Sequence, residues 1–176
     1  FINNQGRPVR TMAKVEVFRF PVIGRLITAA KQIPVDRGTS RAIQSLHSAI
    51  EAVNAGECVL VYPEGTLTRD PDLWPMTAKN GVARIALTTG APVIPLAQWG
   101  AHEVLAPYDP RPHLFPRKTI HVSAGEPVQL DDLRDQPMTA SVLTEATLRI
   151  MRALTLELAK IRGQEPPETP FDRGDL

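Results

Sequence analysis

Cysteine is the scarcest residue in this sequence, with Cys58 its only occurrence in 176 residues. A single cysteine excludes an internal disulfide and a metal site built on cysteines, and it is typical of a reducing compartment. The chain also lacks any apolar run near the roughly 18 residues that a membrane-spanning helix requires, and it has no secretory signal pattern. Its few aromatic residues do not alternate with basic ones as in nucleic-acid-binding modules, so nucleic acid is the least favoured partner. These absences leave a globular chain of ordinary domain size.

Acidic residues are scarce at the start of the chain. Residues 1–41 carry eight basic residues against two acidic ones, although the net charge of the whole chain is only +1. Such a segment can face anionic lipid or a phosphate-bearing substrate, or it can be a solvated face that pairs with acids elsewhere. Within it, residues 18–30 are mostly apolar, with Arg19 and Arg25 as the charges. We interpret them as a short helix or loop whose apolar side packs in the core; the alternative is a basic amphipathic helix on a membrane surface.

The pattern of apolar residues predicts alternating strands and helices. Strand-like segments cover residues 9–17, 33–37, 58–62, 93–99 and 119–124, and helical periodicity covers residues 40–55, 79–89 and 139–162. The segment 58–62 is apolar without alternation, which is typical of a strand buried on both faces of a parallel sheet. We therefore expect an α/β fold with a single domain over residues 1–163, a mixed, largely parallel sheet flanked by helices, and a polar, mobile tail over residues 164–176.

A carboxylate follows this apolar strand directly. Pro63 cannot donate to a sheet ladder and ends the strand, and Gly65 allows a left-handed turn or a close approach of the backbone to a ligand. Glu64 is thereby displayed, with Gly65 and Thr66, at the carboxyl end of a buried strand, where open α/β sheets bind ligands. The alternative is an ordinary solvated turn glutamate.

Two cations are candidates to complete a site with Glu64. Arg37 ends the strand-like segment 33–37, and Lys79 stands at the start of the helix predicted over residues 79–89. Guanidinium and ammonium groups bind phosphate, and a carboxylate accepts hydrogen bonds from hydroxyls. The three side chains together suit a phosphate ester with a neighbouring hydroxyl, such as a glycerol phosphate.

Four short blocks occur in the order and spacing of a known family. Tyr62–Thr66 reads Y-P-E-G-T and resembles the F-P-E-G-T motif of the glycerolipid acyltransferases, the 1-acyl-glycerol-3-phosphate (lysophosphatidate) acyltransferase family. Ile33–Arg37, Lys79–Ala83 and Ala91–Leu96 resemble the blocks that lie on either side of that motif. The resemblance covers residues 8–100, with a looser likeness beyond them.

The resemblance implies an O-acyltransferase of phospholipid biosynthesis. Such an enzyme moves a fatty acyl group from acyl-CoA or acyl carrier protein to the free hydroxyl of 1-acyl-glycerol-3-phosphate and forms phosphatidic acid. The resemblance implies that Arg37, Glu64 and Gly65 bind the phosphate and glycerol of the acceptor, with Thr66 and Lys79 as further members of the site. It implies no metal and no bound cofactor, since the thioester donor carries the activation. The basic, apolar-rich segment at the start of the chain fits a peripheral position on the cytoplasmic face of the cell membrane.

Two departures from the family pattern bear on activity. The family has an arginine after Glu-Gly-Thr, where this chain has Leu67 and then Arg69 two residues later, which leaves open another lysophospholipid or a glycolipid as the acceptor. The family's first block, His-x4-Asp, supplies the base that deprotonates the acceptor hydroxyl, and no such pattern occurs in this sequence. We expect that histidine and aspartate upstream of Phe1, so no catalytic residue is assigned within the chain. The alternative is a non-catalytic lipid- or phosphate-binding module, a truncated or base-less relative of the acyltransferases.

Overall fold

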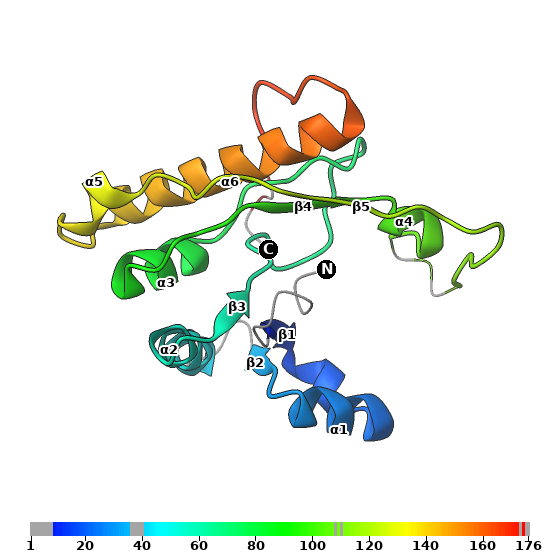
Figure 1. Cartoon of the computed structure of the whole chain (residues 1–176), viewed down its shortest axis with the longest axis horizontal. Coiled ribbons are helices and arrows are strands. Elements are labelled where there is room, and N and C mark those ends of the chain that lie inside the picture. Colours follow the sequence, from blue (N-terminus) through cyan, green and yellow to red (C-terminus); the bar gives the residue numbers. More distant parts are fainter. Residues whose placement is uncertain (1–8, 36–40, 108, 110, 173, 175–176) are drawn as a thin grey trace. The chain divides into compact units, whose positions relative to one another are not determined.

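Figure 1 shows the computed structural model of the chain, which describes residues 9–35, 41–107, 109, 111–172 and 174. The chain divides into two compact units, Phe1–Tyr62 with Arg84–Ala91, and Pro63–Ala83 with Pro92–Leu176. Helix α3 (Gly81–Thr89) contributes residues to each unit. Among the described residues, no helix combines the length and the apolar character that crossing a bilayer requires.

The first unit holds a three-stranded parallel sheet. Its strands are β1 (Val9–Lys14), β2 (Ile33–Val35) and β3 (Cys58–Leu60), in the order β2-β1-β3. Met12 is the ladder partner of Ile33, and Val9 that of Cys58. Parallel neighbours need crossover connections. These are the 3-10 helix η2 (Val15–Arg19) with helix α1 (Pro21–Ala29), and helix α2 (Arg41–Asn54). The predicted α/β class, with parallel strands and flanking helices, is confirmed.

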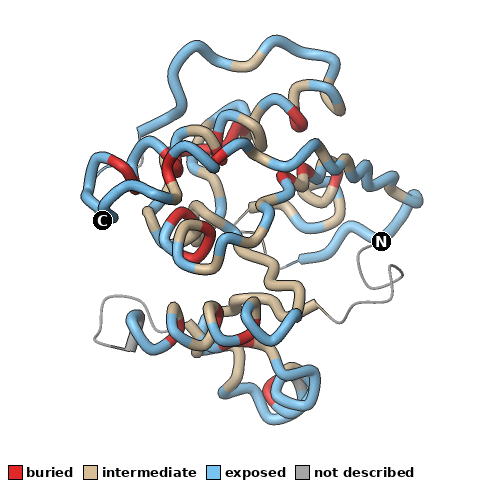
Figure 2. Tube along the Cα trace, turned by 60° about the vertical axis from the view of Figure 1, so that its left-hand side comes forward, coloured by how far each residue is buried: buried red, intermediate tan, exposed pale blue. Residues whose placement is uncertain are grey.

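The apolar side of α2 packs against this sheet. Ala49 and Ala52 are buried together with Ile33 of β2 and Ile85 of α3. Partly buried apolar side chains complete the cluster: Met12, Leu46, Ile50, Val53, Val59 and Val61. In Figure 2 buried positions recur at intervals along the helices rather than in continuous stretches, as expected for amphipathic helices with one inward face.

Helix α1 corrects one expectation from the sequence. We interpreted the apolar side of this segment as core, but Phe20, Val22 and Leu26 are exposed. Gly24 is the buried position among the residues of α1 whose burial is described, and it lies so close to η2 that an added Cβ would come within 2.1 Å of the Phe18 carbonyl oxygen. The helix therefore approaches its own unit through its glycine, while Val22 and Leu26 stay exposed and Ile27 is half-buried.

The second unit is built on two antiparallel strands and one long helix. β4 (Leu96–Trp99) pairs with β5 (His121–Ala124), and α6 (Ala140–Arg162) packs against both. Trp74, Ala97 and Leu158 form the buried cluster between them. Two short helices, α4 (Ala101–Val104) and α5 (Asp131–Arg134), lie in the connections that leave β4 and β5.

The ends of α6 agree with the sequence. Thr139 caps its first turn by accepting a hydrogen bond from the Val142 N–H at 3.3 Å, and Gly163 follows its last residue with φ of 60°. Strand β3 differs from the prediction. It ends at Leu60, two residues early, and it is half-buried rather than buried on both faces, because β1 is its only partner among the described strands.

The segment predicted as a mobile tail is held at one point. Phe171 forms a parallel bridge with Met76, and the Thr77 N–H donates to the Phe171 carbonyl at 3.0 Å. The bridge brings this C-terminal segment against the loop that begins at Pro63, which carries most of the site residues predicted from the sequence.

Candidate functional site

Glu64 anchors the loop between β3 and α3. Its side chain is half-buried, and its Oε2 accepts a hydrogen bond from the Met76 N–H at 3.0 Å. The Met76 side chain is fully buried, so this backbone donor lies in a region that water reaches poorly. The carboxylate therefore joins the two ends of the loop, and its position is fixed by the loop rather than by solvent.

Gly65 gives the turn after Glu64 its shape. Its φ is 69°, in the left-handed region that glycine enters without a steric cost. The reversal sets the half-buried Thr66 beside Glu64 on the same turn. The expectation that Gly65 allows a left-handed turn is confirmed, but Glu64 does not follow the strand directly, because β3 ends at Leu60 rather than at Pro63.

The remainder of the loop is held by its own polar side chains. The Thr68 hydroxyl donates to the Trp74 carbonyl at 2.6 Å. Asp70 Oδ1 accepts from the Asp72 N–H at 2.8 Å and from the Trp74 N–H at 3.2 Å, as in an Asx turn. These hydrogen bonds hold the loop in one conformation, so the turn at Glu64 is part of an ordered loop.

Lys79 closes the same loop. It is exposed and precedes α3 by two residues. Its neighbour Asn80 is fixed, because the buried Thr147 hydroxyl lies 3.0 Å from Asn80 Oδ1. Arg69 and Leu67, at the positions where the sequence departs from the family pattern, are both exposed.

The structure thus places four of the five predicted site residues on one loop of the second unit. Glu64, Gly65 and Thr66 stand at its beginning and Lys79 at its end, and the Glu64–Met76 hydrogen bond draws the beginning to within three residues of Lys79. Arg37 lies outside the described residues. The turn offers carboxylate and hydroxyl acceptors, and Lys79 offers a cation, which together suit a polyol carrying a phosphate.

No histidine in the described ranges is hydrogen-bonded or ion-paired to a carboxylate. His47, His102, His113 and His121 belong to different segments, and the ring contact of His102 is with Trp99, at 4.3 Å between centroids. A base of the His–Asp type is therefore not assembled from the part of the chain that the structure describes. In the same part, no group of three or more histidine, cysteine, aspartate or glutamate residues could hold a metal ion.

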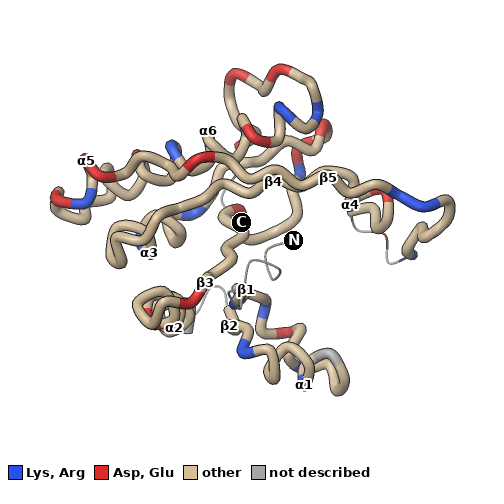
Figure 3. The backbone as a smooth tube through the Cα atoms, viewed as in Figure 1, with Lys and Arg blue, Asp and Glu red and all other residues tan. Residues whose placement is uncertain are grey.

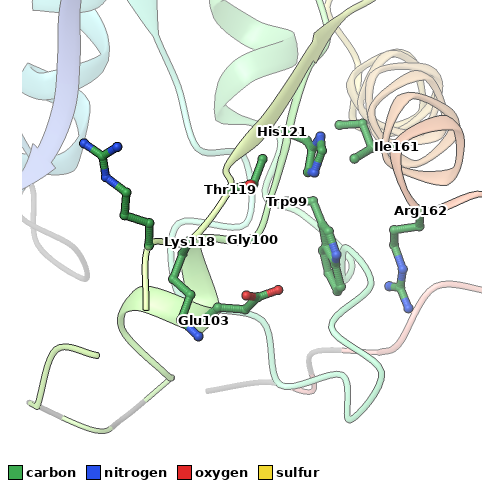
Figure 4. Close-up of a pocket in the computed structure, with 9 residues that line it drawn as sticks. Trp99, Gly100, Glu103, Lys118, Thr119, His121, Ile161 and Arg162 are labelled. Atoms are coloured by element: carbon green, nitrogen blue, oxygen red, sulfur yellow. The ribbon is translucent and has the colours of Figure 1, made fainter. Parts of the chain in front are cut away.

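A pocket of about 510 Å³ in the second unit was missed by sequence reasoning. Four basic side chains line it, namely Arg117, Lys118, His121 and Arg162, together with one acid, Glu103. In Figure 4 the Trp99 indole stands between Arg162 on one side and Lys118 with Glu103 on the other. Because these residues come from separate segments, no single sequence motif predicts the pocket. The adjacent basic residues Arg117 and Lys118 are the one feature of the sequence that indicates it.

Arg162 is held in place by two aromatic rings and a backbone acceptor. Its guanidinium carbon lies 4.0 Å from the ring centroid of Trp74 and 4.4 Å from that of Trp99, and its Nη1 donates to the Asp72 carbonyl at 2.8 Å. Burial lowers the pKa of Arg162 from its ordinary value, and the charges of Asp72 and Asp70 partly offset the effect. The side chain joins the end of α6 to the loop that carries Glu64 and is part of the framework of this unit.

Comparison with known proteins agrees with the resemblance. The family model described as Acyltransferase matches residues 1–99. A 1-acyl-sn-glycerol-3-phosphate acyltransferase of Limnanthes douglasii is 36% identical over 99 residues, which cover 54% of this chain and 34% of that protein. Proteins of the same name from Cocos nucifera and Bacillus subtilis are 30% and 26% identical over 72% and 87% of this chain, and over 40% and 72% of their own lengths.

One solved structure is similar in fold. It is the 1-acyl-sn-glycerophosphate (LPA) acyltransferase PlsC from Thermotoga maritima, which superposes with a TM-score of 0.59 at 21% identity. The match covers 91% of this chain and 59% of that one. At this identity the likeness concerns the fold, and this chain spans only about a third of the length of the Limnanthes relative.

Proposed function

Because this chain belongs to the Acyltransferase family, we propose that it carries the acceptor site of an O-acyltransferase. The acyl group passes from the thioester of acyl-CoA or acyl carrier protein to the free hydroxyl of 1-acyl-glycerol-3-phosphate, which gives phosphatidic acid. The thioester C–S bond breaks, an ester C–O bond forms, and the hydroxyl proton passes through a general base to the departing thiolate. The names of the relatives support this acceptor.

The observation that carries the proposal is the fixed carboxylate of Glu64. A carboxylate has about four lone-pair sites, so the Met76 N–H and a substrate hydroxyl can share it. The turn at Gly65 brings backbone close to the same place, and Thr66 adds a hydroxyl. A glycerol backbone bound here has its hydroxyl oriented before the acyl donor arrives, which lowers the entropic cost of the transfer.

Positive charge at this site binds the phosphate of the acceptor. Lys79 is exposed near the end of the loop that Glu64 begins, and we assign Arg37 to the same phosphate on the basis of the family motif. An arginine can bind two phosphate oxygens at once, whereas a lysine acts as a point charge. The loss of Arg37 therefore weakens binding more than the loss of Lys79.

The base of the reaction is assigned to no residue in this chain, because the sequence has no His-x4-Asp pattern. This observation also favours a second candidate function, a lipid- or phosphate-binding module without catalysis. Both candidates use the Glu64 turn for binding, and they differ in whether acyl transfer follows. The proposed activity, with its acyl donor and its acceptor, is a proposal for the whole protein, of which this chain carries the acceptor site.

The exposed residues at the end of η2 and along α1 support a membrane-associated position. Phe20, Val22 and Leu26 are exposed, and the basic residues Arg19 and Arg25 stand among them. Apolar side chains with flanking cations bind the interface of anionic bilayers. We place the protein peripherally on the cytoplasmic face of the cell membrane, where its lipid acceptor is found.

The test compares variants of the whole protein in acyl transfer to 1-acyl-glycerol-3-phosphate. Glu64→Gln is expected to raise KM for the acceptor about tenfold, the equivalent of a hydrogen bond to a charged group, and Arg37→Ala is expected to raise it more. The exposed Glu145→Gln of α6 is the matched control and should leave KM unchanged. Unchanged kinetics in Glu64→Gln and Arg37→Ala would contradict the site. A wild type that binds the acceptor through Glu64 without acyl transfer would identify the second candidate.

A further inference from the structure

The connection between α4 and β5 exposes two adjacent large apolar side chains. Leu114 is 60% exposed and Phe115 is 88% exposed, the highest value among the large apolar side chains in the described ranges. Isolated exposed apolar residues are common on protein surfaces, but two neighbours at such exposure, in a long connection, mark an interaction site.

Basic residues flank this apolar pair. Arg111 precedes it, and Arg117 and Lys118 follow it after Pro116. Arg111 pairs with Asp109 at 3.4 Å, whereas Arg117 and Lys118 form no ion pair with an acid that the structure describes. Figure 3 shows the basic positions along the stretch that leads into β5. The sequence R-P-H-L-F-P-R-K over residues 111–118 thus contains no acid and three permanent cations.

A hydrogen bond fixes the start of this loop, and its apolar pair stays exposed to solvent rather than packing on the unit. The His113 N–H donates to the Val104 carbonyl at 2.7 Å, which fixes the loop to the end of α4. On the other side, Lys118 and Thr119 lead into β5 and line the basic pocket of Figure 4. The apolar tip and the two cations therefore occupy one short, anchored segment.

We propose that residues 111–118 form a membrane-insertion loop. Leu114 and Phe115 enter the interfacial region of an anionic bilayer, and Arg117 and Lys118 contact lipid phosphates. The proposal extends the membrane part of the proposed function to a second surface, independent of α1. A bilayer fits better than a protein partner, because two side chains fall far short of the roughly 1,000 Å² that a specific protein interface buries. A fluid interface instead accepts a small apolar tip with basic flanks.

The experiment measures partition of the whole protein into phosphatidylcholine vesicles with and without about 30% phosphatidylglycerol. Replacing both apolar residues, Leu114→Ser with Phe115→Ser, should lower the partition coefficient about tenfold or more on either vesicle, because the inserted apolar area is lost. Arg117→Gln with Lys118→Gln should lower it about tenfold on the anionic vesicles and little on the neutral ones. Leu148→Ser with Leu156→Ser, two exposed leucines of α6, is the matched control and should bind as wild type does.

A direct measure of insertion uses Phe115→Trp and lipids brominated on their acyl chains. Vesicle binding should quench the fluorescence of this variant more than that of the wild type, whose tryptophans are Trp74 and Trp99. Equal quenching, or wild-type partition of the double serine variant, overturns the proposal. If the double serine variant keeps its vesicle binding but loses binding to purified acyl carrier protein, the proposal is also overturned, and the loop is identified as a protein contact.

The outcome is separable from the proposed function. Glu64→Gln lies outside this loop and should partition as wild type does, even where its transfer kinetics change. Loss of acceptor affinity in Glu64→Gln with unchanged partition of the double serine variant removes the loop proposal alone. Reduced partition of that variant with unaltered kinetics of Glu64→Gln and Arg37→Ala removes the acceptor-site assignment alone.

Discussion

The buried carboxylate of Glu157 joins β5 to α6, and its removal gives a prediction with a defined pH dependence. The side chain is 6% exposed and accepts hydrogen bonds from the Ser123 hydroxyl at 2.8 Å and from the Lys160 ammonium. The Lys160 bond, and then that from Ser123, hold the pKa of Glu157 below its ordinary value of 4.5, although burial acts in the opposite direction. The folded state therefore favours the charged form.

Glu157→Gln keeps the shape of the side chain and removes its charge. Hydrogen bonds to a charged group contribute about 1.5–3 kcal/mol, so we expect the variant to lose about 2 kcal/mol at pH 7. For a chain of this length that corresponds to a melting temperature lower by about 4–8 °C. Because the pKa of Glu157 is lower in the folded than in the unfolded protein, its charge stabilises the fold fully at pH values above the pKa of the unfolded state. This stabilisation is lost as the pH falls through the pKa of the folded state. The difference between wild type and variant should therefore shrink below about pH 4.5.

Gly125 provides an independent test of the same contact. A Cβ at this position would lie 2.6 Å from Glu157 Oε1 and 2.9 Å from its Cγ, so Gly125→Ala displaces the carboxylate from its donors. In a Glu157→Ala background the carboxylate is absent, so Gly125→Ala should lower the free energy of unfolding much less than it does in the wild type. Thermal unfolding followed by circular dichroism measures all four proteins of this cycle. Additive effects, or a Glu157→Gln deficit that is equal at pH 7 and pH 3.5, would refute the reasoning.

Two further predictions concern the loop of the candidate site. Glu64→Ala leaves the buried Met76 N–H without its acceptor and should destabilise the protein by about 1–3 kcal/mol, whereas Glu64→Gln retains an acceptor oxygen; equal melting temperatures for the two variants would contradict this role. Arg162→Ala removes the cation that contacts both Trp74 and Trp99, so it should cost about 1–2 kcal/mol and shift tryptophan emission, and an unchanged spectrum with an unchanged melting temperature would count against the contact.

Features that depend on neighbouring residues in the sequence were predicted well. The ends of α6 follow from a capping threonine and a glycine with positive φ, both of which act within one turn. The Glu64 turn follows from Pro63 and Gly65 in the same way. Pro63 restricts its own φ, whereas Gly65 and Gly163 tolerate a positive φ without a steric cost, so the sequence specifies the local geometry of these turns.

Features that depend on which segments meet were predicted poorly. β1 lies in the middle of the parallel sheet, although its alternation is weak and the strongly apolar β3 is an edge of the described sheet. An apolar run shows that a strand prefers burial, but not which strands flank it. Likewise, α1 packs through Gly24, a contact determined by its distance from η2 rather than by its pattern of large residues. The basic pocket was missed for the same reason, since the residues that line it meet only in the folded unit.

The loop that carries the site combines both kinds of information. A local sequence motif predicts the Glu64 carboxylate. The loop is held, however, by bonds outside that motif, such as those of Asp70 and the backbone bridge from Phe171 to Met76. A carboxylate bound on one side to a backbone donor cannot move freely toward a substrate, so the loop must already hold it in position. Leu67 is exposed beside this turn, so a different side chain at that position would leave the hydrogen bond between Glu64 and the Met76 N–H in place.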